Sequence, residues 1–184
     1  MKNILLFLLS ALFLQIESPV ANGQDIPVSI GNWRFHMPYQ KAYFVEQAGD
    51  RIYCASKFGL FSLDRSDGNI EQYTRLTGLS DFGFAGMWYC KTRHQLLIAY
   101  ENSNIDLLNT EDNSVINIPD LKQASIIGGK RINDAVFIGK YAYLATGFGI
   151  EVVDLEKYEM QATYTFPPGD PTYVAVNAVA YNGS

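Results

Sequence analysis

The chain has 184 residues, of which 48% are hydrophobic, 14% aromatic and 18% charged. This length is sufficient for one globular domain, and the composition excludes a disordered chain. The formal net charge is −5 and no run of basic residues stands out, which argues against nucleic acid as a partner. The high aromatic content favours β-strands, where flat side chains pack across a pleated surface.

Residues 1–23 have the pattern of a secretory signal peptide. A lysine near the N-terminus precedes the apolar run Ile4–Leu14, and Ala21 and Gly23 place small residues at positions −3 and −1 of a cleavage site. The apolar run is too short to span a bilayer as a transmembrane anchor, and no cysteine follows it as in a lipoprotein. We expect cleavage after Gly23, an exported mature chain that begins at Gln24, and no transmembrane segment.

The segment Asn32–Tyr39 is dense in aromatic residues. Such a segment is either a platform for a ligand or partner, or an N-terminal strand that packs on the domain. We favour the strand, because most aromatic side chains in proteins are structural.

An internal repeat indicates the fold. Each copy is an apolar strand, a short turn and a second apolar strand that is closed by Asp or Asn. The copies are Arg51–Asp64, Gln95–Asn109 and Tyr141–Asp154, so their closing residues are 45 positions apart. A period near 45 with several short strands per unit is typical of a β-propeller blade.

The rest of each unit accommodates four strands, in blades of about residues 42–74, 84–118 and 132–166. The predicted strands are Ala42–Gln47, Arg51–Ser56, Gly59–Asp64 and Asn69–Thr74; Phe84–Cys90, Gln95–Tyr100, Asn104–Leu108 and Ser114–Ile118; and Ile132–Ile138, Tyr141–Thr146, Gly149–Asp154 and Met160–Phe166. Their runs are apolar on both faces, as expected for sheets that neighbouring blades cover on both sides. The glycines that follow the central turn, Gly59 and Gly149, predict a positive φ or a close backbone approach.

After the proline-rich linker Pro167–Pro171, residues 173–184 resemble the start of a fourth blade, with Tyr173–Tyr181 as its opening strand. The predicted fold class is therefore all-β: a partial β-propeller of about three four-stranded antiparallel blades plus the first strand of a fourth. Because a propeller usually needs four to eight blades to close, we expect residues 24–184 to form an incomplete N-terminal propeller domain of a longer protein.

No motif for catalysis, a cofactor or a metal is recognisable. Neither His36 nor His94 lies near a cysteine or paired carboxylates at metal-ligand spacing. The segment Asp64–Asn69 faintly resembles a calcium loop, but it lacks the alternate ligands and the distal Glu, so we interpret it as a turn. We predict that the protein is not an enzyme and has no cofactor; the sequence does not identify its binding residues.

Two cysteines, Cys54 and Cys90, remain in the predicted mature chain. An exported protein could pair them. Both lie in apolar runs typical of strands, where an unpaired cysteine serves as a small buried hydrophobic residue. We favour the unpaired state, because spacing alone does not establish the geometry of a disulfide.

The order of several motifs resembles a known family. Thr74–Asp81 is similar to the junction before an innermost strand in two-component-regulator-type propellers. A closer resemblance is to the PorZ family of the type IX secretion system, and it covers nearly the whole predicted mature chain. The resembling stretches are Ile30–Tyr39, Gly78–Asp81, Asn117–Leu121, Gly129–Asp134 and Tyr141–Ile150.

This resemblance implies a non-enzymatic protein at the bacterial cell surface or outer membrane. Members of the family have two propellers and a C-terminal β-sandwich, and they act in the complex that processes secreted cargo and joins it to surface lipopolysaccharide. The implied partners are other outer-membrane secretion and attachment subunits, with lipopolysaccharide or another glycan as a further candidate. The alternative is a periplasmic oligosaccharide-sensing propeller of a hybrid two-component regulator, and a propeller lyase or glycosidase comes third.

Overall fold

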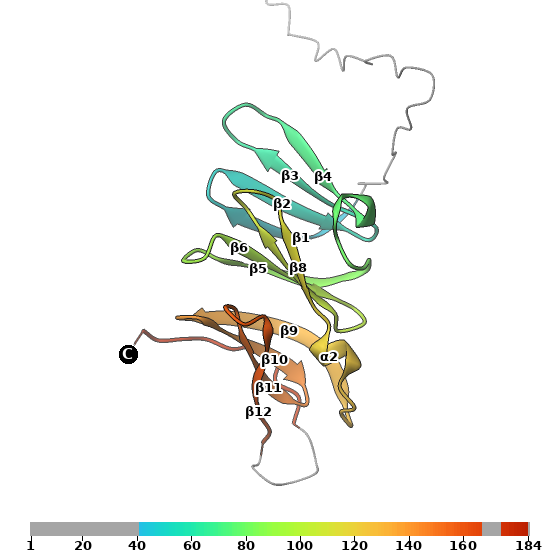
Figure 1. The fold of residues 1–184 in the computed structure, drawn as a ribbon, viewed down its shortest axis with the longest axis vertical. Helices are drawn as coiled ribbons and strands as arrows, with labels where there is room; N and C mark the ends of the chain where they lie inside the picture. Colours follow the sequence, from blue (N-terminus) through green and yellow to red (C-terminus); the bar gives the residue numbers. More distant parts are fainter. Residues whose placement is uncertain (1–40, 167–173, 184) are drawn as a thin grey trace, which may run out of the picture. The chain divides into compact units, whose positions relative to one another are not determined.

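The computed structural model describes residues 41–166 and 174–183, and it places the strands of this part in three four-stranded sheets (Figure 1). The predicted signal peptide of residues 1–23, the aromatic segment Asn32–Tyr39, His36 and the linker Pro167–Pro171 lie outside the described residues.

Each sheet is a run of consecutive strands in which every strand pairs antiparallel with the next. The first sheet comprises β1 (Ala42–Ala48), β2 (Arg51–Ser56), β3 (Leu60–Asp64) and β4 (Ile70–Tyr73). The second comprises β5 (Phe84–Cys90), β6 (Gln95–Tyr100), β7 (Ile105–Asn109) and β8 (Val115–Ile118). The third comprises β9 (Gly129–Ile138), β10 (Tyr141–Gly147), β11 (Gly149–Asp154) and β12 (Glu159–Tyr164). The predicted all-β fold, a partial β-propeller, is thereby confirmed.

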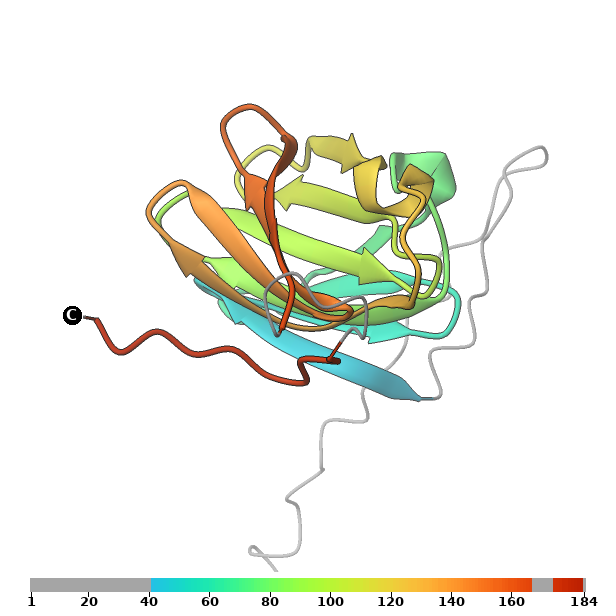
Figure 2. The same ribbon diagram turned by 90° about the horizontal axis from the view of Figure 1, so that it is seen from below.

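The second sheet lies between the first and the third, and its two faces build separate hydrophobic clusters (Figures 1 and 2). Side chains alternate between the faces of a strand. In β6, Leu96 and Ile98 therefore join the cluster shared with the first sheet, whereas Leu97 and Ala99 join the cluster shared with the third. This arrangement explains why the strand sequences are apolar on both faces.

The 45-residue period has a structural cause in the turn between the third and fourth strands. The side chains of Asp64, Asn109 and Asp154 each accept the backbone N–H two residues later, at 2.8 Å in all three sheets. Four residues after each of them the chain takes a positive φ: 74° at Gly68, 61° at Asn113 and 59° at Tyr158. The sequence repeat is thus a repeated Asx turn that reverses the chain at the same point in every sheet.

The glycine prediction, a positive φ or a close backbone approach, is confirmed at Gly149. Gly149 has a φ of 141°, and a Cβ there would lie 2.1 Å from the carbonyl oxygen of Tyr164. Gly59 is not among the described residues with a positive φ.

Two short helical turns, which the sequence did not predict, connect the sheets. The 3₁₀ turn η1 (Arg75–Thr77) precedes the second sheet, and the one-turn helix α2 (Asp120–Gln123) precedes the third. Leu79, just after η1, and Leu121, in α2, each insert into the cluster between the two sheets that their connection joins. Each junction therefore contributes to the core.

Residues 174–183 carry no strand, although an opening strand was predicted there. A strand requires a backbone ladder with a neighbour, and this segment makes isolated contacts instead. Val176 N–H donates to Thr146 O at 2.8 Å, and Asn133 Nδ2 donates to Val176 O at 2.9 Å. Val179 N–H donates to Asp134 Oδ2 at 3.1 Å. The segment is thus fixed to β9 and β10 of the third sheet.

Among the described residues, no helix is long and apolar enough to cross a membrane.

Candidate binding site

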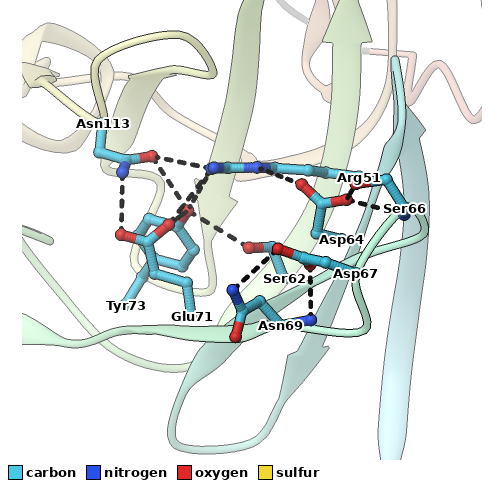
Figure 3. A network of polar contacts seen from close by, with 9 residues as sticks. All are labelled: Arg51, Ser62, Asp64, Ser66, Asp67, Asn69, Glu71, Tyr73 and Asn113. Atoms are coloured by element: carbon cyan, nitrogen blue, oxygen red, sulfur yellow. Dashed lines mark hydrogen bonds and ion pairs between the residues drawn. The ribbon is translucent and has the colours of Figure 1, made fainter.

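A polar network lies where the first sheet meets the β7–β8 turn of the second (Figure 3). Its residues come from β2, β3, β4 and two turns, and strand register brings them together. Arg51 pairs with Asp64 across β2 and β3, and Ser62 pairs with Glu71 across β3 and β4. Because paired residues of neighbouring strands share a face, these side chains all point toward the second sheet.

The turn Asp64–Asn69 is organised by its own side chains. Asp64 Oδ1 accepts the backbone N–H and the hydroxyl of Ser66 at 2.8 and 2.6 Å. Asp67 accepts the backbone N–H of Asn69 at 2.8 Å and its side-chain amide at 2.9 Å. The hydrogen bonds from Ser66 lower the pKa of Asp64 below its usual value of 3.8. These contacts confirm that the segment forms a turn.

The centre of the network joins the two sheets. Asn113 Nδ2 donates to Glu71 Oε1 at 2.8 Å, and Tyr73 OH donates to Asn113 Oδ1 and Glu71 Oε2 at 3.0 Å each. Arg51 lies 3.2 Å from Glu71 Oε2 and 3.8 Å from Asp64 Oδ2. Burial and the neighbouring Glu71 carboxylate raise the pKa of Tyr73, although a contact with Ser62 opposes this shift. Tyr73 therefore stays a neutral donor that holds the β7–β8 turn against the first sheet.

A cavity of about 260 Å³ adjoins this network. Three carboxylates, from Asp64, Asp67 and Glu71, and one guanidinium, from Arg51, lie on its wall. The wall therefore has an excess of negative charge and offers hydrogen-bond acceptors. The contacts of the network join the two sheets, and the cavity beside it has an acidic surface.

A second polar cluster lies between the same two sheets and is centred on Asp106, which is fully buried together with Tyr100. Asp106 Oδ2 accepts Tyr100 OH at 2.7 Å and the backbone N–H of Ser80 at 2.8 Å, and Oδ1 accepts Asn117 Nδ2 at 2.8 Å. Ser80 belongs to the motif Gly78–Asp81, which the sequence analysis singled out. The motif is thus anchored by a carboxylate of the following sheet.

The last residue of that motif connects two junctions. Asp81 accepts a hydrogen bond from Asn102 Nδ2 and forms an ion pair of 2.9 Å with Lys122 of α2. A similar contact recurs one sheet later, where the Met160 N–H donates to Asp120 Oδ2 at 3.1 Å. Junction acids therefore hold successive sheets in place.

The remaining chemically suggestive residues do not converge. His94 is exposed, with Nδ1 3.9 Å from Glu111 Oε1 and 3.4 Å from Tyr89 OH. Within residues 41–166 and 174–183, no group of three or more His, Cys, Asp or Glu side chains could hold a metal ion. Cys54 and Cys90 are both free, as expected for the unpaired state, but only Cys90 is buried and Cys54 is half-buried.

The sequence analysis did not single out Arg51, Glu71, Tyr73 or Asn113. One signal was available: Asn113 occupies the repeat position of Gly68, 45 residues earlier, where the turn requires a positive φ. An Asn tolerates that conformation and adds a side chain that can cross to the neighbouring sheet.

Comparison with known proteins gives one family and a set of solved structures. The family described as "TSS9, PorZ, N-terminal beta-propeller domain" matches residues 52–183. A solved structure of PorZ from Porphyromonas gingivalis is 28% identical with a TM-score of 0.62, and the match covers 67% of this chain and 17% of that chain. The structure of AztD from Citrobacter koseri is 19% identical with a TM-score of 0.52, covers 67% of this chain and 33% of that chain, and shows a likeness of fold alone. No curated protein sequence matches the chain.

Proposed function

The chain belongs to the family of N-terminal β-propeller domains of PorZ of the type IX secretion system, and from this we propose that it is part of a non-enzymatic propeller subunit that supports type IX secretion and the attachment of cargo proteins to the cell surface. The observation that carries the proposal is the family match over residues 52–183, which includes all strands of the second and third sheets and most of the first.

The similar structure from Porphyromonas gingivalis supports the surface location. That protein is described as an essential bacterial surface component of the type IX secretion system. The chain spans less than a fifth of its length, since the match covers 17% of it. The signal-peptide pattern of residues 1–23 is consistent with export to such a location.

The proposed partners are other outer-membrane secretion and attachment subunits, with lipopolysaccharide or another glycan as an additional ligand. A scaffold role fits the chemistry of the described residues, where the buried acids Asp106 and Glu151 accept hydrogen bonds from the protein itself.

The test is deletion of the gene that encodes this chain in its native bacterium. We expect secreted cargo to remain unprocessed and to be lost from the cell surface, as measured by immunoblotting of cell-envelope and medium fractions. The wild-type gene should restore both, and a matched gene without codons 2–23 should not, because its product stays inside the cell. Normal cargo attachment with a ligand-dependent defect in transcription would favour a sensory propeller and contradict the proposal.

A further inference from the structure

A second groove lies at the opposite end of the strands from the polar network. It has a volume of about 280 Å³ and collects residues from all three sheets. Tyr43 and Phe44 come from the start of β1, Phe84 from the start of β5, and Arg131 from the start of β9. Its volume is close to the lower end of the range for small-ligand sites, about 300–1,000 Å³.

The apolar wall of the groove is partly rigid. Phe84 is only 7% exposed, and its ring lies 5.5 Å from that of Tyr100. Tyr43, in contrast, is 60% exposed. An apolar side chain of a ligand would therefore meet one fixed aromatic ring and cover one that is open to solvent.

Two cations face the groove without an anionic partner among the described residues. Lys57 is exposed and its Nζ lies 5.2 Å from the centroid of the Phe58 ring. Arg131 is exposed as well. Glu101 is the other charged residue of the wall, so the groove has an excess of one positive charge in a chain whose net charge is −5. A carboxylate is complementary to the two cations.

The groove also lies beside the ends of two terminal strands. β1 and β5 are each the end strand of their sheet, so one edge of each has no strand partner in the described part of the chain. Free strand edges bind extended peptides through main-chain hydrogen bonds, and pockets beside the edge select the side chains.

We propose that this groove binds an extended peptide segment of a partner protein, with a peptide carboxylate on Lys57 and Arg131 and an apolar side chain against Tyr43 and Phe84. This inference goes beyond the proposed function, because it specifies a ligand for the groove whatever process the protein serves.

The experiment is isothermal titration calorimetry of the purified full chain with two acetylated, amidated hexapeptides, TVEFEV and its uncharged counterpart TVQFQV. We expect the acidic peptide to bind at least about ten-fold more tightly, with a difference that shrinks between about 50 and about 500 mM salt because screening weakens exposed charge pairs. Lys57→Gln and Arg131→Gln should each reduce this preference, and the double variant should remove it.

Arg65→Gln is the matched control, since Arg65 is an exposed cation in the β3–β4 turn at the other end of the strands. Its peptide preference should equal that of the wild type, and thermal unfolding of every variant should remain unchanged. Equal binding of the two peptides, or an equal loss in Arg65→Gln, would overturn the proposal. Binding of neither peptide would also overturn it, as expected if another part of the chain fills the groove. Binding of polygalacturonate, an acidic polysaccharide titrated in the same way, in place of the peptides would overturn it as well.

Discussion

The first and second sheets share one strand order and one turn design, yet their burial differs. Every residue of β6 in the second sheet is buried, whereas Ile70 in β4 of the first sheet is 62% exposed. The second sheet has a hydrophobic cluster on each face, and the first has one only on the face toward its neighbour. The comparison shows that two sheets with the same hydrogen-bond ladder differ in burial according to how many neighbouring sheets cover them.

Core truncation should give the largest contrast between the two sheets. Leu97→Ala in β6 removes a fully buried side chain from the cluster between the second and third sheets, and should lower the free energy of unfolding by about 2–5 kcal/mol. The matched change in the first sheet, Val45→Ala, affects a side chain that is 61% exposed and should cost about 0.5 kcal/mol or less. Urea unfolding followed by tryptophan fluorescence measures both. Similar losses would mean that the outer face of the first sheet is covered in solution.

Replacement of one carboxylate by an amide should distinguish the fully buried Asp106 from the half-buried Asp64. Asp106→Asn places an amide among three donors in the second sheet and should cost about 1–3 kcal/mol. Asp64→Asn in the first sheet should be nearly neutral, because Asn109 makes the same turn contact at the equivalent position. The unfolding assay tests the pair, and an equally large loss at Asp64 would show that its pairing with Arg51 matters more than the turn.

A smaller effect is expected at the boundary between the two sheets. Tyr73→Phe removes the hydroxyl that bonds to Asn113 and Glu71, and should cost about 1 kcal/mol. Tyr43→Phe is the control within the same sheet, since Tyr43 is 60% exposed, and it should leave the unfolding midpoint unchanged. If Tyr73→Phe is also silent, the polar network does not stabilise the contact between the sheets.

The smallest expected effect is a pH dependence in the third sheet. Burial raises the pKa of Glu151 above its ordinary value of 4.5. For Asp154 burial acts in the same direction, but hydrogen bonds from the Glu156 and Lys157 N–H groups and from Lys140 lower the pKa to about 2. Ionised Asp154 therefore stabilises the fold at pH values above its unfolded-state pKa of about 3.8. This stabilisation is lost as the pH falls toward the folded-state pKa of about 2. Glu151 instead costs stability as the pH rises through its elevated pKa, and costs nothing below its unfolded-state value.

Replacement of each carboxylate by the amide of the same shape should therefore shift the unfolding midpoint in opposite directions. Glu151→Gln should raise the unfolding midpoint at about pH 7 and have no effect at about pH 3, whereas Asp154→Asn should lower it at about pH 7 with a loss that shrinks below about pH 4. Thermal unfolding over this pH range is the measurement. Curves that stay parallel to the wild type would contradict both assignments.

The strands were predictable here because the apolar runs and the repeat can both be recognised in the sequence without knowledge of tertiary contacts. All the strands of the three sheets were predicted within a few residues, and the largest error was β9, which begins at Gly129 and not at Ile132. The turns η1 and α2 were missed, since three or four residues carry no detectable helical period.

The polar network was not predictable in the same way. Arg51, Tyr73 and Asn113 come together only when the strand register and the packing of two sheets are known. The sequence repeat indicates that Asn113 adopts a special backbone conformation, but the direction of its side chain depends on the neighbouring sheet.

Several side-chain hydrogen bonds and ion pairs join one sheet or junction to a later part of the chain. Glu46 accepts the N–H of Tyr89, Ser80 is held by Asp106, Asp81 by Lys122, and Asp134 accepts the N–H of Val179. A chain that emerges from a ribosome or a translocation channel N-terminus first can therefore form each sheet early but can secure it only after a further 26 to 45 residues have followed.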